Sequence, residues 1–226
     1  MQEKNKQEKV NTGDKINDFI QRNRKVIFTI SGIIIVLFIG SIVYLSINDN
    51  INKKASVKME ELLVKYAEIK EKTGEEDSKE EVDAYLAELE VFAAKTKGIA
   101  GSKAWSIIGE IYAGREDWHR AEEAFISSAR TGEKTYLGPL SYLNAAAAAE
   151  EHGEFEQALD LLKKCLSSKI EFPQAPRAQF AVGRINEKLG NFPDALEAYR
   201  AVMINWPDMP AWQQLAQSRI TAIEIR

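Results

Sequence analysis

A pattern of small and large residues recurs three times after residue 100, and no other feature constrains the fold as strongly. Its alanines, Ala121, Ala158 and Ala195, are spaced 37 residues apart both times. A small residue stands 12 positions before each alanine, and a large one follows four positions after it. Small residues let two helices approach closely, and large residues fill the space between their turns. We therefore predict consecutive helix pairs, each of which buries its apolar face against the next pair, so that the pairs form a stack.

The aligned residues resemble a known repeat. They are Trp105, Ile108, Gly109, Tyr112, Ala121 and Phe125; Tyr142, Ala145, Ala146, Ala149, Ala158 and Leu162; and Gln179, Val182, Gly183, Asn186, Ala195, Tyr199 and Pro207. This arrangement resembles the tetratricopeptide repeat, which is about 34 residues long with a W-x₂-L-G-x₂-Y…A-x₃-F…P pattern. The resemblance implies an all-α fold, an α-solenoid of antiparallel helix pairs. We expect Gly153 and Gly190 to end the first helix of their repeats in a left-handed conformation.

The repeats predict the following domain organisation. Residues 98–210 hold three repeats, and residues 211–226 form a C-terminal capping helix, as a terminal repeat requires. Residues 49–97 form a linker and a divergent first helical hairpin that turns at Thr73–Asp77, with Tyr66, Leu86, Leu89 and Phe92 on its core face.

An uncharged stretch near the N-terminus predicts a membrane anchor. Residues 26–48 contain no charged residue over 23 positions, which at about 1.5 Å per residue spans a hydrocarbon core of about 30 Å. A cleaved signal peptide is the alternative, but its apolar region would be about 7–15 residues long with a small-residue cleavage site. Here the run is longer and ends in Tyr44-Leu45-Ser46-Ile47-Asn48. We therefore expect an uncleaved single-pass transmembrane helix.

The distribution of charge predicts the orientation. Residues 1–25 carry seven basic and four acidic residues, and Arg22, Arg24 and Lys25 adjoin the apolar run. Basic residues favour the cytoplasmic side, so we expect residues 1–25 to be a short, disordered cytoplasmic tail. The repeats then lie in the periplasm or outside the cytoplasm of a bacterium, anchored in the inner membrane.

Composition and motifs predict a binding protein that catalyses nothing. The part after residue 25 is acidic, which argues against a nucleic-acid partner. Cys165 is the single cysteine, so an intrachain disulfide is excluded, and we expect it to be buried and inert. His119 and His152 lie 33 positions apart and are read as surface residues. Since the sequence has no phosphate-binding, metalloprotease or nucleophile-elbow motif, we expect no catalytic residue, metal or cofactor.

The resemblance implies a groove lined by the first helix of each repeat. By repeat position its residues are Lys103, Ser106, Ile107 and Glu110; Leu140, Leu143, Asn144 and Ala147; and Arg177, Phe180, Ala181 and Arg184. Asn144 and Arg177 match the clamp with which some family members hold a C-terminal carboxylate, whereas Ser106, Glu110 and Ala181 do not. We expect instead that exposed Leu143 and Phe180 contact an apolar segment of a partner, while the two arginines orient it.

The arrangement as a whole resembles the ancillary SecYEG translocon subunit family, which is anchored in the inner membrane with a periplasmic tetratricopeptide-like domain. That resemblance implies partners at the Sec translocon, exported chains and a membrane-anchored periplasmic chaperone. Two other interpretations remain: a scaffold for cell division, outer-membrane assembly or a transporter, and a regulator of a separate catalytic chain. The sequence does not indicate an oligomeric state.

Overall fold

The computed structural model describes residues 12–72 and 78–225, and within these residues all regular structure is helical. The helices are α1 (Thr12–Arg22), α2 (Arg24–Lys72), α3 (Ser78–Lys95), α4 (Gly98–Gly114), α5 (Trp118–Thr131), α6 (Leu137–Glu151), α7 (Phe155–Leu166), α8 (Ala175–Lys188), α9 (Phe192–Asn205) and α10 (Pro210–Glu224). The predicted all-α class is confirmed. The turn predicted at Thr73–Asp77 lies outside the described residues.

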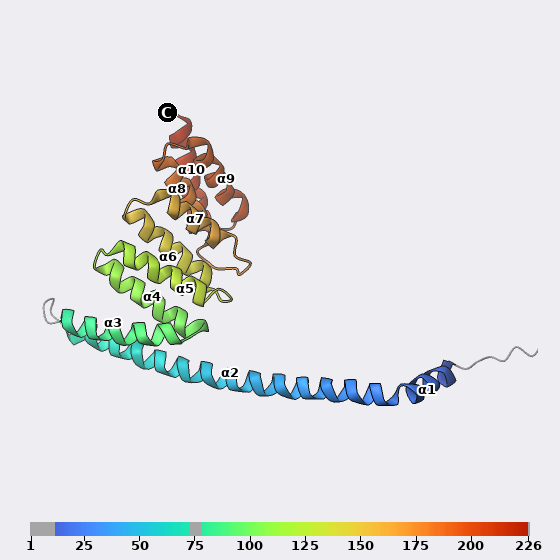
Figure 1. The fold of residues 1–226 in the computed structure, drawn as a ribbon. Helices are drawn as coiled ribbons and strands as arrows, with labels where there is room; N and C mark the ends of the chain where they lie inside the picture. Colours follow the sequence, from blue (N-terminus) through green and yellow to red (C-terminus); the bar gives the residue numbers. More distant parts are fainter. Residues whose placement is uncertain (1–11, 73–77, 226) are drawn as a thin grey trace, which may run out of the picture. The chain divides into compact units, whose positions relative to one another are not determined.

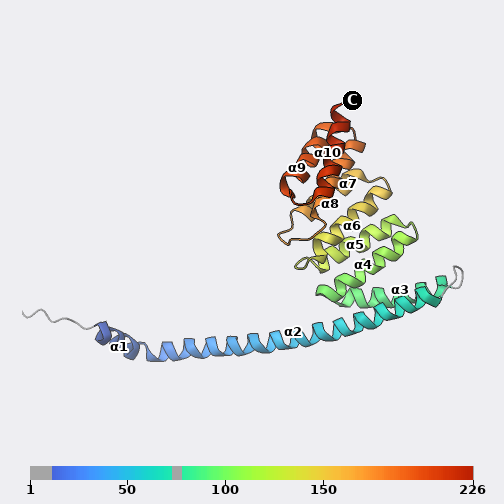
Figure 2. The ribbon, with the colours of Figure 1, turned by 180° about the vertical axis from the view of Figure 1, so that it is seen from behind.

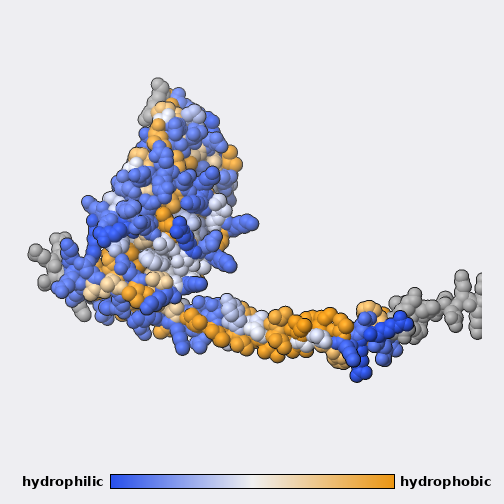
Figure 3. All heavy atoms as spheres, viewed as in Figure 1, coloured by the Kyte–Doolittle hydropathy of each residue, from blue (hydrophilic) through white to orange (hydrophobic). Residues whose placement is uncertain are grey.

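The chain divides into two units, residues 1–51 and residues 52–226. The first contains α1 and the N-terminal part of α2, an apolar helix that is coloured orange in Figure 3. Among the described residues one helix, within Arg24–Glu71, is long and apolar enough to cross a membrane, with a mean hydropathy of 2.8 and none of its apolar window buried. A signal sequence meets the same criteria of length and composition.

Helix α1 corrects one expectation from the sequence. Residues 12–22 are helical, so the expectation that the whole segment before the apolar run is disordered is wrong for this part. Ile16, Phe19 and Ile20 are spaced as neighbours on one face of a helix, and that spacing is a signal that the charge count of the segment obscured.

The second unit is a stack of helices that run back and forth (Figures 1 and 2). Each helix from α3 to α9 packs on the helix that follows it in the chain. One hydrophobic cluster extends from Met59 in α2 to Ile185 in α8, and a second one joins α9 and α10 around Tyr199 and Ile220. Since each helix pair is covered by its neighbours, the arrangement is the one that the repeat pattern predicts.

The same turn ends α4, α6 and α8. Gly153 and Gly190 have φ values of 89° and 77°, as expected for a left-handed cap. Their N–H groups donate to Glu150 O and Glu187 O at 3.1 Å, and the N–H of the next residue reaches back five positions along the helix. Glu116 occupies the equivalent position after α4, with the same bonds and a φ of 59°. The three turns are 37 residues apart, so they fix the repeat register in the backbone.

Glycines admit aromatic rings at two helix contacts. A Cβ on Gly109 would lie 2.7 Å from the Phe125 ring, and a Cβ on Gly183 would lie 2.5 Å from the Tyr199 ring. A real Cβ does not approach another atom so closely, so each ring occupies the volume that a side chain would need. These are the pairs that the 12-and-four spacing predicts in the first and third repeats.

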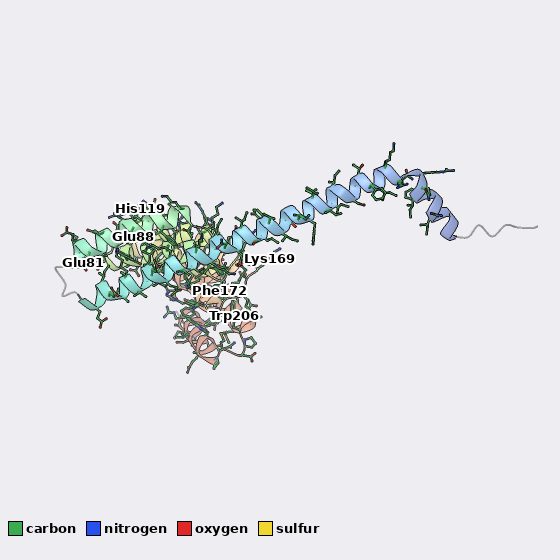
Figure 4. All side chains as sticks on the ribbon, turned by 90° about the horizontal axis from the view of Figure 1, so that it is seen from below. Glu81, Glu88, His119, Lys169, Phe172 and Trp206 are labelled. Atoms are coloured by element: carbon green, nitrogen blue, oxygen red, sulfur yellow. The ribbon has the colours of Figure 1, made fainter. Side chains whose placement is uncertain are left out.

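The hairpin of α2 and α3 closes the N-terminal end of this stack. The rings of Tyr66 and Tyr85 stack with centroids 5.0 Å apart. Glu88 pairs with Lys65 at 2.6 Å and with Lys58 at 3.5 Å, and Figure 4 labels it where α3 runs beside α2. Leu89 is fully buried. The buried residues of the hairpin belong to the same hydrophobic cluster as those of α4 to α8, and its description as a divergent first repeat remains a prediction.

Candidate protein-binding surface

The predicted groove residues lie on three alternate helices of the stack, α4, α6 and α8. Four of them are exposed: Glu110, Ala147, Arg177 and Arg184. Six are half-buried: Lys103, Ser106, Leu140, Asn144, Phe180 and Ala181. Because α4 also contacts α6 directly, Ala147 and Glu110 come from helices that lie side by side. The structure thus places most of the predicted residues at least partly at the surface, but it does not test whether they bind anything.

Two of the predicted groove residues belong to the core. Leu143 is 3% exposed and Ile107 is 8% exposed, so the expectation that Leu143 offers an apolar contact to a partner is wrong. The reason lies in the composition of α6, where an alanine run leaves no contrast between an apolar and a polar face. The packing of α5, α7 and α4 on this helix decides which side remains accessible.

Phe180 is held in place by two other aromatic side chains. Its ring centroid lies 5.0 Å from that of Tyr199 in α9 and 5.7 Å from that of Trp212 in α10. Tilted pairs at this distance are favourable beyond the area they bury. Phe180 is only half-buried, so it presents a rigid apolar edge to the surface.

Arg184 is engaged within the protein rather than free to bind a partner. It donates two hydrogen bonds to the Glu150 carboxylate in α6, the second to Oε2 at 2.6 Å, and Lys188 donates a third at 3.0 Å. Burial acts to raise the pKa of Glu150, but the hydrogen bonds from Arg184 and Lys188 outweigh it and lower this pKa below its ordinary value. The pair therefore ties α6 to α8.

A comparable ion pair joins α8 to α10, but the equivalent positions between α4 and α6 carry no charged residues. Arg219 in α10 binds Glu187 in α8, through Nε at 3.1 Å and through its terminal nitrogen. One repeat before Glu150 and Arg184, the equivalent positions are Ala113 and Ala147. The surface between α4 and α6 consequently has two alanines where the later junctions have charged side chains.

A second hollow lies apart from these residues, and the sequence analysis missed it. The loops that follow α7 and α9 enclose a cavity of about 860 Å³ with Lys169, Phe172 and Trp206 among its lining. Figure 4 labels these three side chains close together. Prolines and aromatics in two successive inter-repeat loops are the sequence signal that could have indicated it. Cys165 also borders it, but it is fully buried and burial raises the pKa of its thiol to about 12. It is therefore inert, as predicted.

The titratable groups do not gather into a metal site in the described part of the chain. His152 is half-buried, with Nε2 at 3.4 Å from the buried Glu122 carboxylate and Nδ1 at 2.9 Å from Ala148 O. Gln157 donates to the same carboxylate at 3.1 Å. These contacts join α5, α6 and α7 and account for Glu122 as a structural residue. His119 is exposed, as expected.

Comparison with known proteins agrees with this repeat geometry. Residues 143–210 match the family model of the tetratricopeptide repeat. The part of the chain from α6 to the start of α10 is therefore similar to tetratricopeptide repeats. The match begins inside α6 and ends at the start of α10, so it covers the second and third predicted repeats in large part.

A relative carries the same description. A TPR repeat-containing protein of Treponema pallidum (strain Nichols) is 35% identical to this chain over 146 residues, which are 63% of this chain. The aligned part spans 60% of the relative's length. Tetratricopeptide repeats are typically protein-interaction modules, and that is the function class that the repeats indicate here.

Proposed function

We propose that this chain is a membrane-anchored tetratricopeptide module that binds a partner polypeptide on the surface of α4, α6 and α8. The observation that carries the proposal is the exposed Ala147 beside half-buried Asn144, in the one junction where two alanines stand in place of an ion pair. A small side chain lets a partner backbone lie close to the helix, and an amide side chain both donates to and accepts from such a backbone.

The flanks of this surface supply specificity. The edge of Phe180 offers an apolar contact, and Arg177 is an exposed cation for which no ion pair is found within the described residues. Glu110 lies at the opposite side and accepts a long bond from Ser106 at 3.5 Å. A negative residue there disfavours a terminal carboxylate, so an internal segment with apolar and acidic residues is the better partner.

A substitution tests the surface. Ala147→Arg places a long charged side chain on the alanine surface between α4 and α6. Because position 147 is exposed, the fold should stay intact. Ala87→Arg is the matched control, because Ala87 is an exposed alanine of α3. We expect tagged full-length Ala147→Arg to recover much less partner from solubilised membranes than wild type, and Ala87→Arg to recover as much. Equal recovery by both variants would exclude this surface.

The anchor belongs to the same proposal. Residues 26–48 cross the inner membrane with the N-terminus in the cytoplasm, and the repeats lie on the other side; the basic flank of Arg24 and Lys25 supports this orientation. A reporter fused after Arg226 should be active outside the cytoplasm while the full-length chain sediments with membranes. Release of a shortened soluble protein would instead identify a signal sequence.

The finer proposal is a translocon-associated adaptor, or a chaperone-like factor for exported proteins. It rests on the resemblance of the whole arrangement, an anchor followed by a hairpin, repeats and a terminal helix. A scaffold for another envelope complex is the alternative, and a regulator of a separate enzyme is a third. Co-purification in mild detergent separates them, since translocon subunits, envelope-assembly proteins or an enzyme would dominate the recovered material.

A further inference from the structure

Helix α1 exposes an apolar face that the protein-binding function does not use. Ile16, Phe19 and Ile20 are 55%, 63% and 48% exposed. Their spacing of three and four residues places them on one side of the helix, whereas Gln21 falls on the other side. An exposed cluster of large apolar side chains on so short a helix needs a partner that covers it.

The neighbouring sequence indicates what covers this face. Only Asn23 separates α1 from α2, and its side chain donates back to Phe19 O at 2.9 Å. The uncharged run begins at Val26, three residues further on. If that run crosses a membrane, the short connection keeps α1 within about one helical turn of the lipid surface. The bilayer is then the nearest apolar phase that can cover this face.

The charges between α1 and the apolar run indicate which kind of membrane surface α1 binds. Arg22, Arg24 and Lys25 follow the apolar face within five positions of its end at Ile20, and no acidic residue lies between Arg22 and Val26. Basic residues beside an amphipathic helix bind anionic headgroups, while large apolar side chains insert at the boundary of headgroups and acyl chains.

We propose that α1 is an interfacial helix that lies on the cytoplasmic leaflet, with Ile16, Phe19 and Ile20 buried in the lipid and the basic cluster among anionic headgroups. This inference rests on the anchor proposed above. It gives the membrane-embedded unit two contacts with the bilayer instead of one, and it fixes the depth at which the transmembrane run begins.

Site-specific fluorescence tests the inference in the full-length chain. Three single variants, Ile16→Cys, Gln21→Cys and Val36→Cys, are labelled with an environment-sensitive dye; buried Cys165 stays unlabelled in the folded protein. Each is reconstituted into phosphatidylcholine vesicles with about a quarter phosphatidylglycerol, and quenching by aqueous iodide is measured. We expect the label at position 16 to be quenched about threefold less than the label at 21, and to emit at shorter wavelength.

The three positions separate the possible failures. Strong quenching at 16 with protection at 36 would overturn the interfacial helix and leave the anchor standing. Strong quenching at 36 would overturn the anchor and, with it, this inference. Protection at 16 that increases with the ratio of protein to lipid would assign the face to a second copy of the chain and contradict the proposal. Equal protection at 16 in pure phosphatidylcholine would contradict the role of the basic cluster.

Discussion

At the scale of single residues, the left-handed position after each first helix decides how well the repeat turn closes. Gly153 and Gly190 adopt it with positive φ, and Glu116 does so with a side chain. A residue with a Cβ is strained in this conformation, whereas glycine is not. The first turn therefore stores strain that the other two do not.

This difference gives a prediction. Glu116→Gly should stabilise the chain by up to about 1 kcal/mol, because relief of strain exceeds the added freedom of the unfolded chain. Gly153→Ala should destabilise it, since it introduces the strain that Glu116 has. Urea denaturation of the two variants beside wild type measures both. If Glu116→Gly lowers the urea midpoint of unfolding, the side chain of Glu116 makes a contact whose stabilisation exceeds the cost of the strained backbone.

A second residue-scale prediction concerns the contact of Gly183 with Tyr199. Gly183→Ala should cost about 1–3 kcal/mol, because the new Cβ overlaps the ring. Tyr199→Leu in the same chain should recover part of that loss, since the second repeat uses alanine and leucine at these positions. Gly114→Ala is the control, because nothing lies within 4 Å of a Cβ there. Strictly additive losses would mean that the two positions are not in contact.

At the scale of elements, α6 shows where sequence pattern stops being informative. The turns at Gly153 and Gly190 were predictable because only glycine fits a left-handed cap easily. Glu116 was not, since nothing in its chemistry indicates positive φ. Within α6 the alanines predict a helix but no face, so Leu143 was placed at the surface when three neighbouring helices bury it. Arg184 is exposed, but it binds Glu150 rather than standing free, and that contact is set by the tertiary stack.

The tie between α6 and α8 predicts a dependence on pH. The pKa of Glu150 is lowered in the folded protein, so its carboxylate contributes stability above the unfolded value of 4.5. That contribution is lost as the pH falls through the lower, folded pKa. Wild type should therefore melt above Glu150→Gln near neutral pH, and the gap should close in acid. A gap that persists unchanged to about pH 2.5 would mean that the charge is not responsible.

At the scale of the whole molecule, the chain consists of two compact units. One unit carries the apolar run and α1, and the other carries the repeat stack. The sequence predicted both, because a long uncharged run and a fixed repeat period are properties of the chain itself. The identity of a partner is not such a property. It depends on a surface of a few side chains whose exposure is decided only when the helices stack.

The central claim is that a partner polypeptide lies on α4, α6 and α8. A photo-crosslinking amino acid at Ala147, introduced into the full-length chain in its own membrane, tests this most directly. Position 163 in α7, where Lys163 is exposed, is the control on the other helix of the same repeat. The account predicts a protein adduct at 147 and little at 163, with the adduct at 147 suppressed by Arg in place of Ala181. An adduct that forms at 163 and not at 147 would contradict it and assign binding to the second helices of the repeats.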